Sequence, residues 1–189
     1  MKIGLFFGTF NPVHLGHTEV VSRVLNENIF NELWVVLTPR SPHKNFTIVK
    51  KKNRLEMLKI AFKNYEKVII SDIEFKLKQP NYTIDTLSYL SDKFPKHTFS
   101  IIMGSDNYLN INTWKKSNKI IEKYPIYIYP RGEFSVKNKM NSKNVYYLNF
   151  PKVRVSSTGI RFGISSKNKE IEQYLSSAVH EYIKTHQLY

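Results

Sequence analysis

KIGLFFGTFNPVHLGH, residues 2–17, joins a continuous apolar run to a turn that carries two histidines. The run Ile3–Phe7 has the length and composition of a buried strand. The glycine and the proline that follow it are typical of a turn, after which a helical spacing of apolar residues begins. A connecting turn needs no histidine, so His14 and His17 indicate a functional site at the end of this strand.

Apolar runs and helical patterns alternate along the rest of the chain. Strands that are apolar throughout, with helices between them, are typical of a parallel sheet covered on both faces. We therefore predict an α/β fold: a doubly wound, Rossmann-like parallel sheet with a small C-terminal helical subdomain. The predicted strands are 2–7, 33–37, 67–71, 99–103, 126–129 and 145–148, and the predicted helices are 15–28, 50–64, 83–93, 113–123, 157–164, 168–175 and 176–186.

Size and composition suit one compact domain, because 189 residues of which 41% are hydrophobic can build a single core. We expect residues 1–189 to form one domain, with a Rossmann-like core over 1–150 and a helical part over 151–189. No apolar run approaches the roughly 18 residues that span a bilayer, and no secretory signal precedes the first strand. The absence of cysteine fits a reducing compartment, so we expect a cytoplasmic protein that does not bind membranes.

The formal net charge of +14 favours anionic partners, such as phosphorylated small molecules or nucleic acid. The lysines are scattered along the chain rather than gathered in one run, which indicates a solvated basic surface. We therefore expect no nucleic-acid partner. A basic nucleic-acid-binding protein is the alternative from another functional class.

The turn after the first strand offers hydrogen-bond donors to an anion. In a doubly wound sheet, ligands bind beyond the carboxyl ends of the strands, beside the first strand. Gly8 allows close backbone approach there, and the amides of Thr9 and Phe10 can face an anion. The next helix adds its positive N-terminal end, beside which the imidazoles of His14 and His17 can donate to phosphate oxygens.

Two other interpretations of the histidine pair stay open on its spacing alone. Zinc would require a third protein ligand, and the chain has neither cysteine nor an H-E-x-x-H pattern, so we expect no metal site in the protein. Alternatively, one histidine caps the helix and the other packs in the core.

VSSTGIR, residues 155–161, is a second candidate anion site. A cluster of Ser and Thr before an apolar residue is an N-cap signal, and we expect Ser157 or Thr158 to cap a helix here. Arg161 follows within one turn, and its planar guanidinium can grip a phosphate through two N–H groups. Taken alone, the segment also fits a capped helix with an arginine at the surface.

GTFNPVHLGH and VSSTGIR resemble the two signatures of the nucleotidyltransferase superfamily that includes the adenylyltransferases of cofactor synthesis. TPRSPHK (38–44), NYTIDTL (81–87), IIMGSDNYLNINTW (101–114) and EYIKTHQLY (181–189) narrow the resemblance, from end to end, to the bacterial nicotinate-nucleotide adenylyltransferases. The resemblance implies that His14, His17 and Arg161 are catalytic. The ATP and phosphate ligands would be Gly8, Thr9, Phe10, Lys44, Ser156, Ser157, Thr158 and Arg161.

Three further residues would bind nicotinate mononucleotide. The resemblance assigns Thr83 and Trp114 to the nicotinate ring and places Asp106 near the nucleotides. Independently, the tryptophan offers a flat face to a pyridine ring, and the aspartate can accept from a ribose hydroxyl. Lys44 is a cation on a predicted loop, suited to triphosphate contact or to solvent.

The implied reaction transfers AMP from ATP to nicotinate mononucleotide and yields nicotinate adenine dinucleotide and pyrophosphate, in NAD biosynthesis. Mg²⁺ would be the cofactor, held mainly by the ATP phosphates, and residues 151–189 would complete the ATP site. Phe7 and Asn11 stand where the family usually has Gly and Asp, and Ser41 stands where it usually has Pro. These departures leave nicotinamide mononucleotide open as the acceptor, and phosphopantetheine is the other alternative within the superfamily.

Overall fold

The computed structural model describes residues 1–40, 48–132 and 142–189. Its strands are β1 (Lys2–Gly8), β2 (Glu32–Leu37), β3 (Val68–Ser71), β4 (Thr98–Gly104), β5 (Ile126–Tyr129) and β6 (Val145–Tyr147). Its α-helices are α1 (Leu15–Asn26), α2 (Lys51–Ala61), α3 (Thr83–Lys93), α4 (Ser105–Leu109), α5 (Ser117–Lys123), α6 (Ser157–Ser165) and α7 (Ser177–Thr185). Short 3-10 helices are η1 (Ile73–Phe75), η2 (Ile111–Thr113) and η4 (Lys169–Tyr174). Within these ranges, no helix has the length and apolar character that a membrane crossing requires.

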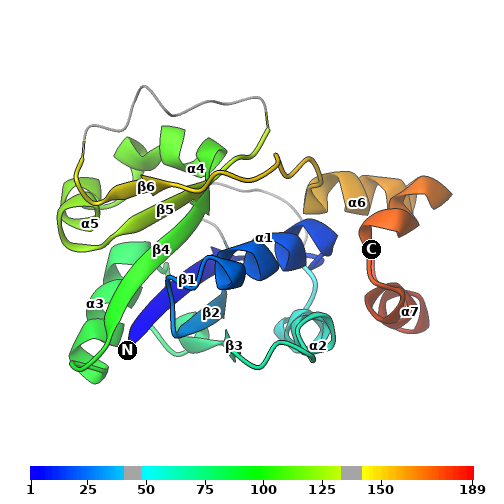
Figure 1. The fold of residues 1–189 in the computed structure, drawn as a ribbon. Helices are drawn as coiled ribbons and strands as arrows, with labels where there is room; N and C mark the ends of the chain where they lie inside the picture. The colour runs from blue at the N-terminus through cyan, green and yellow to red at the C-terminus, as the bar shows by residue number, and fades with distance from the viewer. Residues whose placement is uncertain (41–47, 133–141) are drawn as a thin grey trace.

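The strands form one parallel sheet in the order β3-β2-β1-β4-β5-β6 (Figure 1). The chain first builds outward from β1 to β3, then returns to the other side of β1 and builds outward to β6. The direction of growth therefore reverses at β1, which is where open parallel sheets bind ligands. Gly8, the last residue of β1, pairs with Leu37 of β2. The predicted doubly wound α/β fold is confirmed.

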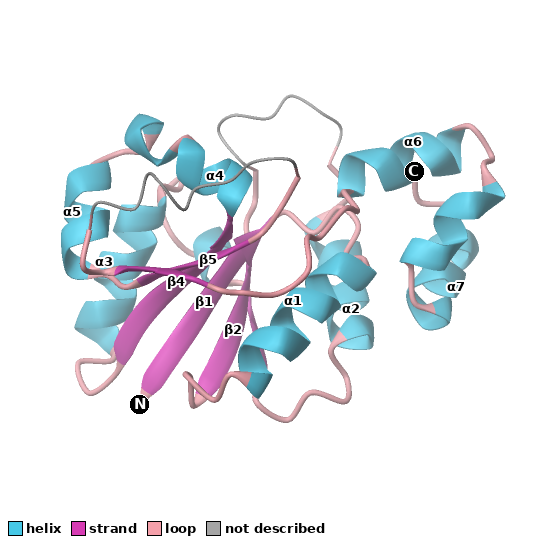
Figure 2. Cartoon of the chain, turned by 45° about the horizontal axis from the view of Figure 1, so that its top comes forward, coloured by secondary structure: helices cyan, strands magenta, loops and turns pink. Residues whose placement is uncertain are grey.

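Side chains that alternate along the strands divide the apolar residues between two cores. Leu5 packs in one core with residues of α3 such as Leu87. Phe6, the next residue along β1, packs in the other core with Val20 of α1 and Leu58 of α2. Figure 2 shows these two helices on the side of the sheet away from α3 and α5. Because helices cover both faces, both faces of each strand are apolar, and this explains the continuous apolar runs in the sequence.

The C-terminal helices join the core of α1 and α2. Ile160 of α6 and Val179 of α7 are almost fully buried in it. The Tyr182 hydroxyl of α7 donates to Asn53 Oδ1 of α2 at 3.3 Å. In Figure 1, α6 and α7 lie on the side of the molecule opposite to α3 and α5. This packing brings the start of α6 to the turn that follows β1.

Three segments differ from the sequence prediction. The helix predicted over 113–123 is split into η2 and α5, because Lys116 has a left-handed backbone with a φ of 53°. Residues 168–175 were predicted to be helical, and they form the 3-10 helix η4 over Lys169–Tyr174. The short helix α4 was not predicted, since five residues are too few to show a helical period.

Candidate active site

A cavity of about 200 Å³, here called the polar cavity, lies at the carboxyl ends of β1, β4 and β5. Segments from the two ends of the chain contribute most of its donors, while Asn107 and Arg131 come from the middle. Its lining includes Gly8, Thr9, Phe10, His17, Asn107, Arg131, Ser156, Ser157, Thr158 and Arg161. The concentration of amide, hydroxyl, imidazole and guanidinium groups suits an anion with several oxygens.

The His17 imidazole has a fixed orientation at the start of α1. His14 is the N-cap of that helix, and its backbone N–H donates to His17 Nδ1 at 3.2 Å. Because Nδ1 accepts, a neutral His17 ring carries its proton on Nε2. Phe10 packs edge-on against this ring, with centroids 4.9 Å apart. The polar cavity is therefore lined by an imidazole whose tautomer and tilt are set by its neighbours.

His14 supports the His17 ring from the buried side. The two rings stack with centroids 3.7 Å apart, and His14 is 3% exposed and absent from the cavity lining. Burial, together with the nearby charge of Arg131, lowers the pKa of His14 to about 3, so the ring is neutral at pH 7. Neither ring nitrogen has a hydrogen-bond partner among the described residues. A buried nitrogen in this state needs an explanation, and a bound ligand is one.

The second predicted motif forms the start of α6. Ser156 is its N-cap and accepts from the Gly159 N–H at 3.1 Å, so the expectation that Ser157 or Thr158 caps the helix is wrong. Three adjacent hydroxyl residues all match the capping signal, and the cap falls on the last one with an extended backbone. Thr158 Oγ1 instead accepts from Arg161 Nη2 at 3.2 Å.

Direct contacts join the two motifs. Arg161 Nη1 donates to the Asn11 carbonyl at 2.8 Å, and Ser157 Oγ donates to the Pro12 carbonyl at 2.9 Å. Gly16 of α1 is buried against Val153 and Val155, whose side chains fill the space that a Cβ would need. The glycine thus allows the segment before α6 to pack directly on the first turn of α1. The two turns form one continuous wall of the polar cavity.

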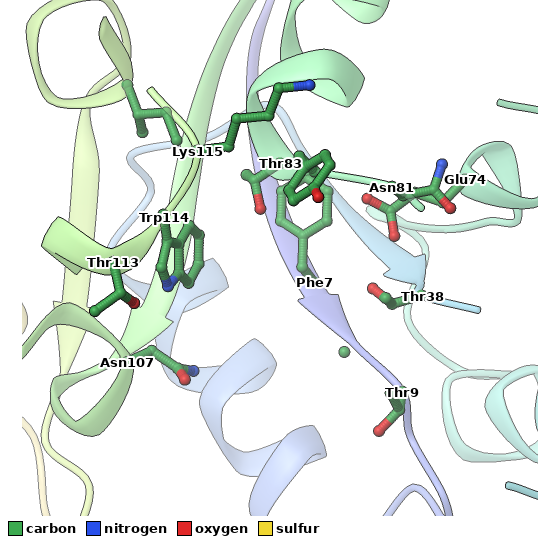
Figure 3. Close-up of a pocket in the computed structure, with 13 residues that line it drawn as sticks. Phe7, Thr9, Thr38, Glu74, Asn81, Thr83, Asn107, Thr113, Trp114 and Lys115 are labelled. Atoms are coloured by element: carbon green, nitrogen blue, oxygen red, sulfur yellow. The ribbon is translucent and has the colours of Figure 1, made fainter. Parts of the chain in front are cut away.

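A second cavity of about 190 Å³, here called the aromatic cavity, lies beside the polar one. Figure 3 shows Trp114 on one side of it and Phe7 and Thr38 on the other. Lys115 Nζ lies at its edge, 2.8 Å from Asp85 Oδ2 and 4.5 Å from the Tyr82 ring centroid. The lining comprises Phe7, Gly8, Thr9, Thr38, Glu74, Asn81, Tyr82, Thr83, Asn107, Thr113, Trp114, Lys115 and Ile120.

The two cavities share the end of β1. Phe7, Gly8 and Thr9 line both of them, and so do Asn107 and Trp114. A ligand in one cavity would therefore meet a ligand in the other next to Gly8 and Thr9. This arrangement suits a reaction that joins a polyanionic molecule to one with a flat ring.

Comparison with known proteins agrees with this geometry. A family model described as Cytidylyltransferase-like matches residues 5–163. A probable nicotinate-nucleotide adenylyltransferase of Flavobacterium psychrophilum is 41% identical over 186 residues, covering 97% of this chain and 96% of that protein. Another, from Flavobacterium johnsoniae, is 40% identical and covers 100% of this chain and 99% of its own length. The chain belongs to the nicotinate-nucleotide adenylyltransferase family.

Solved structures show that this family member has the fold of more distant proteins. The Plasmodium falciparum nicotinic acid mononucleotide adenylyltransferase complexed with NaAD has a TM-score of 0.88 at 24% identity, covering 99% of this chain and 96% of its own. The same protein complexed with APC has a TM-score of 0.87.

The structure gathers most of the predicted site residues of this adenylyltransferase family member into the two cavities. Thr83 and Trp114 line the aromatic cavity, and Trp114 lines the polar one as well. Lys44 lies outside the described residues. His14 and Asp106 line neither cavity. The polar cavity contains Gly8, Thr9, Phe10, His17, Ser156, Ser157, Thr158 and Arg161.

Asp106 lies directly behind the wall of the polar cavity. Its Oδ2 is 3.6 Å from Arg131 Nη1, and its Oδ1 is buried with no hydrogen-bond partner among the described residues. Asn107, the next residue, lines both cavities. The sequence analysis selected the aspartate of GSDN and missed the asparagine. The helix that begins here has only five residues, so its pattern does not show which of the two side chains points toward the cavities.

Two further residues of this family member, one inside the first motif and one outside any motif, make buried contacts that the sequence does not show. Asn11 is fully buried, and its Oδ1 accepts from the Val49 N–H at 3.1 Å and from the Tyr189 hydroxyl at 2.8 Å. Glu74 is 3% exposed, and its Oε1 accepts from Thr86 Oγ1 at 2.9 Å. Burial raises the pKa of Glu74. Glu74 lines the aromatic cavity, which only the fold shows, whereas Asn11 lines neither cavity.

Proposed function

We propose that this chain transfers AMP from ATP to nicotinate mononucleotide, yielding nicotinate adenine dinucleotide and pyrophosphate in NAD biosynthesis. One observation carries the proposal: a cavity of phosphate-binding donors meets an aromatic cavity at Gly8 and Thr9. In this proposal residues 1–189 act as one domain in the cytoplasm, and residues 151–189 complete the ATP site. Relatives that carry the adenylyltransferase name over nearly the whole chain support it.

The reaction requires alignment more than acid–base chemistry. A 5′-phosphate oxygen of the mononucleotide attacks the α-phosphorus of ATP, the bond from that phosphorus to the α–β bridging oxygen breaks, and pyrophosphate leaves with the electron pair. The second pKa of a phosphate monoester is about 6, so the nucleophile is already ionised at neutral pH. The protein must hold two anions together and stabilise the charge that develops in the transition state.

The polar cavity supplies that stabilisation in our proposal. The amides of Thr9 and Phe10 and the Nε2–H of His17 would meet the phosphates from the β1 side. Ser156–Thr158 and Arg161 would hold the leaving pyrophosphate from the α6 side. His14 is neutral, so it contributes orientation of His17 and, with ligand bound, one N–H donor. Lys44 is proposed as a further phosphate ligand.

The aromatic cavity would hold the pyridine nucleotide. The Trp114 indole offers a face for ring stacking, and Thr83 stands at the start of α3, where a hydroxyl and backbone amides suit a carboxylate. Asp106, whose Oδ2 lies 3.6 Å from Arg131 Nη1, is proposed to bind the mononucleotide near its ribose. This places the 5′-phosphate of the mononucleotide at Gly8 and Thr9, where the two cavities meet.

Mg²⁺ is proposed to be held mainly by the phosphates of ATP. No group of three or more His, Asp or Glu side chains is gathered as metal ligands in the described ranges. The polar cavity instead presents N–H and O–H donors, which fit phosphate oxygens rather than a cation. The ion would offset phosphate charge as the transition state forms.

Turnover with defined acceptors tests the proposal. The purified chain is incubated with ATP, Mg²⁺ and either nicotinate mononucleotide, nicotinamide mononucleotide or phosphopantetheine, and pyrophosphate release and product mass are recorded. We expect the highest kcat/KM with nicotinate mononucleotide. A higher value with either other acceptor, or no turnover with all three, would refute the proposed function.

A further inference from the structure

Arg54 is a buried arginine outside both cavities that contacts the phosphate-binding turn from behind. It lies on α2, it is 2% exposed, and it lines neither cavity. Its guanidinium donates to four backbone carbonyls: Nε to Val49 at 2.9 Å, Nη1 to Thr9 at 2.9 Å and to Thr38 at 2.8 Å, and Nη2 to Pro39 at 3.2 Å. One side chain thus connects the ends of β1 and β2 to the segment that precedes α2.

This arginine is buried without a carboxylate partner among the described residues, whereas buried charges are usually paired. Carbonyl dipoles and the face of the Phe75 ring, whose centroid lies 5.6 Å from Arg54 Cζ, balance the charge. Burial lowers the pKa of Arg54 to about 10, so the group is still protonated at pH 7. An apolar side chain would fill the same space at a lower desolvation cost. We infer that the arginine contributes through its hydrogen bonds to these carbonyls rather than through packing.

The contact with Thr9 determines where the next amide points. The Thr9–Phe10 peptide is trans, and in a trans peptide the C=O and the N–H point in opposite directions. A Thr9 carbonyl that points to Arg54 therefore directs the Phe10 N–H away from α2. Thr9 and Phe10 both line the polar cavity.

The same peptide is held in an unusual conformation. Phe10 has a φ of 43°, in the left-handed region that non-glycine residues seldom adopt. Such conformations persist only where the surroundings over-determine them, and they concentrate at functional sites. Here the Gly8 carbonyl accepts from the Thr38 N–H at 2.8 Å, and Arg54 holds the next carbonyl along the chain.

We propose that Arg54 is a positioning residue that turns the Thr9–Phe10 peptide so that the Phe10 N–H faces the triphosphate. The proposal rests on the proposed function, because it assigns ATP to the polar cavity. Arg54 itself touches no substrate. A purely structural arginine would affect the free energy of unfolding but leave the kinetics of the folded enzyme unchanged.

Substitution with a matched control separates these roles. Arg54→Lys keeps the charge but cannot reach four carbonyls, and Arg54→Ala leaves a space that methylguanidinium can enter. Arg23→Lys on α1, an exposed arginine paired with Glu19 at 2.9 Å, is the control. Kinetics are measured at a temperature where circular dichroism shows each variant fully folded. We expect kcat/KM for ATP to fall at least ~10-fold in Arg54→Lys, the scale of one charged hydrogen bond.

We further expect methylguanidinium to restore kcat/KM for ATP in Arg54→Ala and to leave Arg23→Lys unchanged. A folded Arg54→Lys variant with wild-type ATP kinetics would overturn the inference. If the wild-type chain itself fails to use ATP, the proposed function fails instead.

A measurement on the wild-type chain keeps the inference testable even if no Arg54 variant folds. In ¹⁵N-labelled protein titrated with ATP, the amide proton of Phe10 should move downfield as it donates to a phosphate oxygen. A Phe10 resonance that stays in place while His17 and Gly159 resonances shift would show that ATP binds without this amide, and would sink the proposal.

Discussion

The polar and aromatic cavities have almost equal volumes and share the end of β1, but their remaining walls differ in origin and chemistry. The polar cavity takes its distinctive residues from the first turn and from the start of α6, at the two ends of the chain. Apart from Thr38, the aromatic cavity takes its own residues from 74–120, in the middle of the chain. The walls found only in the polar cavity hold hydroxyl, imidazole and guanidinium donors, whereas those found only in the aromatic cavity hold a tyrosine and a lysine at the rim. We infer that the first cavity controls the chemical step and the second controls the choice of acceptor.

The largest effect is expected from His17→Ala, which removes an oriented donor from the polar cavity. We expect kcat to fall at least ~100-fold, the scale for loss of one transition-state donor. Steady-state kinetics with ATP and nicotinate mononucleotide measure it, with the exposed His186 replaced by Ala as the control. Normal turnover in folded His17→Ala would refute the inference that the polar cavity controls the chemical step.

Trp114→Ala should act mainly on acceptor binding. Loss of a stacking face costs about 1–3 kcal/mol, so KM for nicotinate mononucleotide should rise about 10-fold or more. Trp114→Phe, which keeps a ring, should recover most of the loss. Because Trp114 lines both cavities, KM for ATP is the decisive second measurement. An equal rise in KM for ATP would contradict the inference that the aromatic cavity controls the choice of acceptor alone.

Lys115→Met tests whether the charge at the rim of the aromatic cavity discriminates between acceptors with and without a ring carboxylate. The Lys115 side chain is 40% exposed and its ammonium is already paired with Asp85, so its attraction for a ring carboxylate is small. We expect KM for nicotinate mononucleotide to rise roughly three- to fivefold and KM for nicotinamide mononucleotide to stay constant. Lys116→Met, which removes the neighbouring charge outside the cavity, is the control. If KM rises equally for both acceptors, the lysine interacts with the phosphate that they share and does not select the ring carboxylate.

The smallest effect concerns stability and sharpens the role of His14 behind the polar cavity. Its pKa is about 3 in the folded chain and about 6.5 in the unfolded chain, so the unfolded state binds the extra proton. Its contribution to stability is therefore full above pH 6.5 and is lost as the pH falls toward 3. Between pH 7 and 5.5 it should lower the free energy of unfolding by about 1 kcal/mol.

Urea unfolding at the two pH values measures this loss, which His14→Asn should reduce and His186→Asn should not. Equal pH dependence in wild type and His14→Asn would mean that the pKa of His14 is the same in the folded and the unfolded chain, so that the folded chain protonates it below about pH 6.5. It would then add a positive charge behind His17, and the polar cavity would carry more charge than we infer.

Local patterns in the sequence determined the strands, most helices and the two motifs proposed to bind phosphate. An apolar run such as Ile3–Phe7, the glycine and proline after it and the hydroxyl cluster at Ser156 each express a preference of neighbouring residues. Trp114 and Thr83 were found because they stand in segments that resemble a family. In the hydroxyl cluster, the sequence pattern placed the N-cap of α6 on the wrong residue, because three adjacent hydroxyl residues fit the capping signal equally.

Only the tertiary structure decided which distant polar residues contact the turn after β1. Tyr189 reaches Asn11 across 178 positions, and Arg54 reaches Thr9 across 45. Nothing in the neighbourhood of these residues signals such contacts, because the contacts arise from how α2 and the C-terminal helices pack against the end of β1. A sequence motif indicates which groups are able to bind phosphate, but it does not fix their orientation or their charge. The orientation of the Phe10 amide, and the burial that keeps His14 neutral, depend on atoms that the folded chain brings from elsewhere.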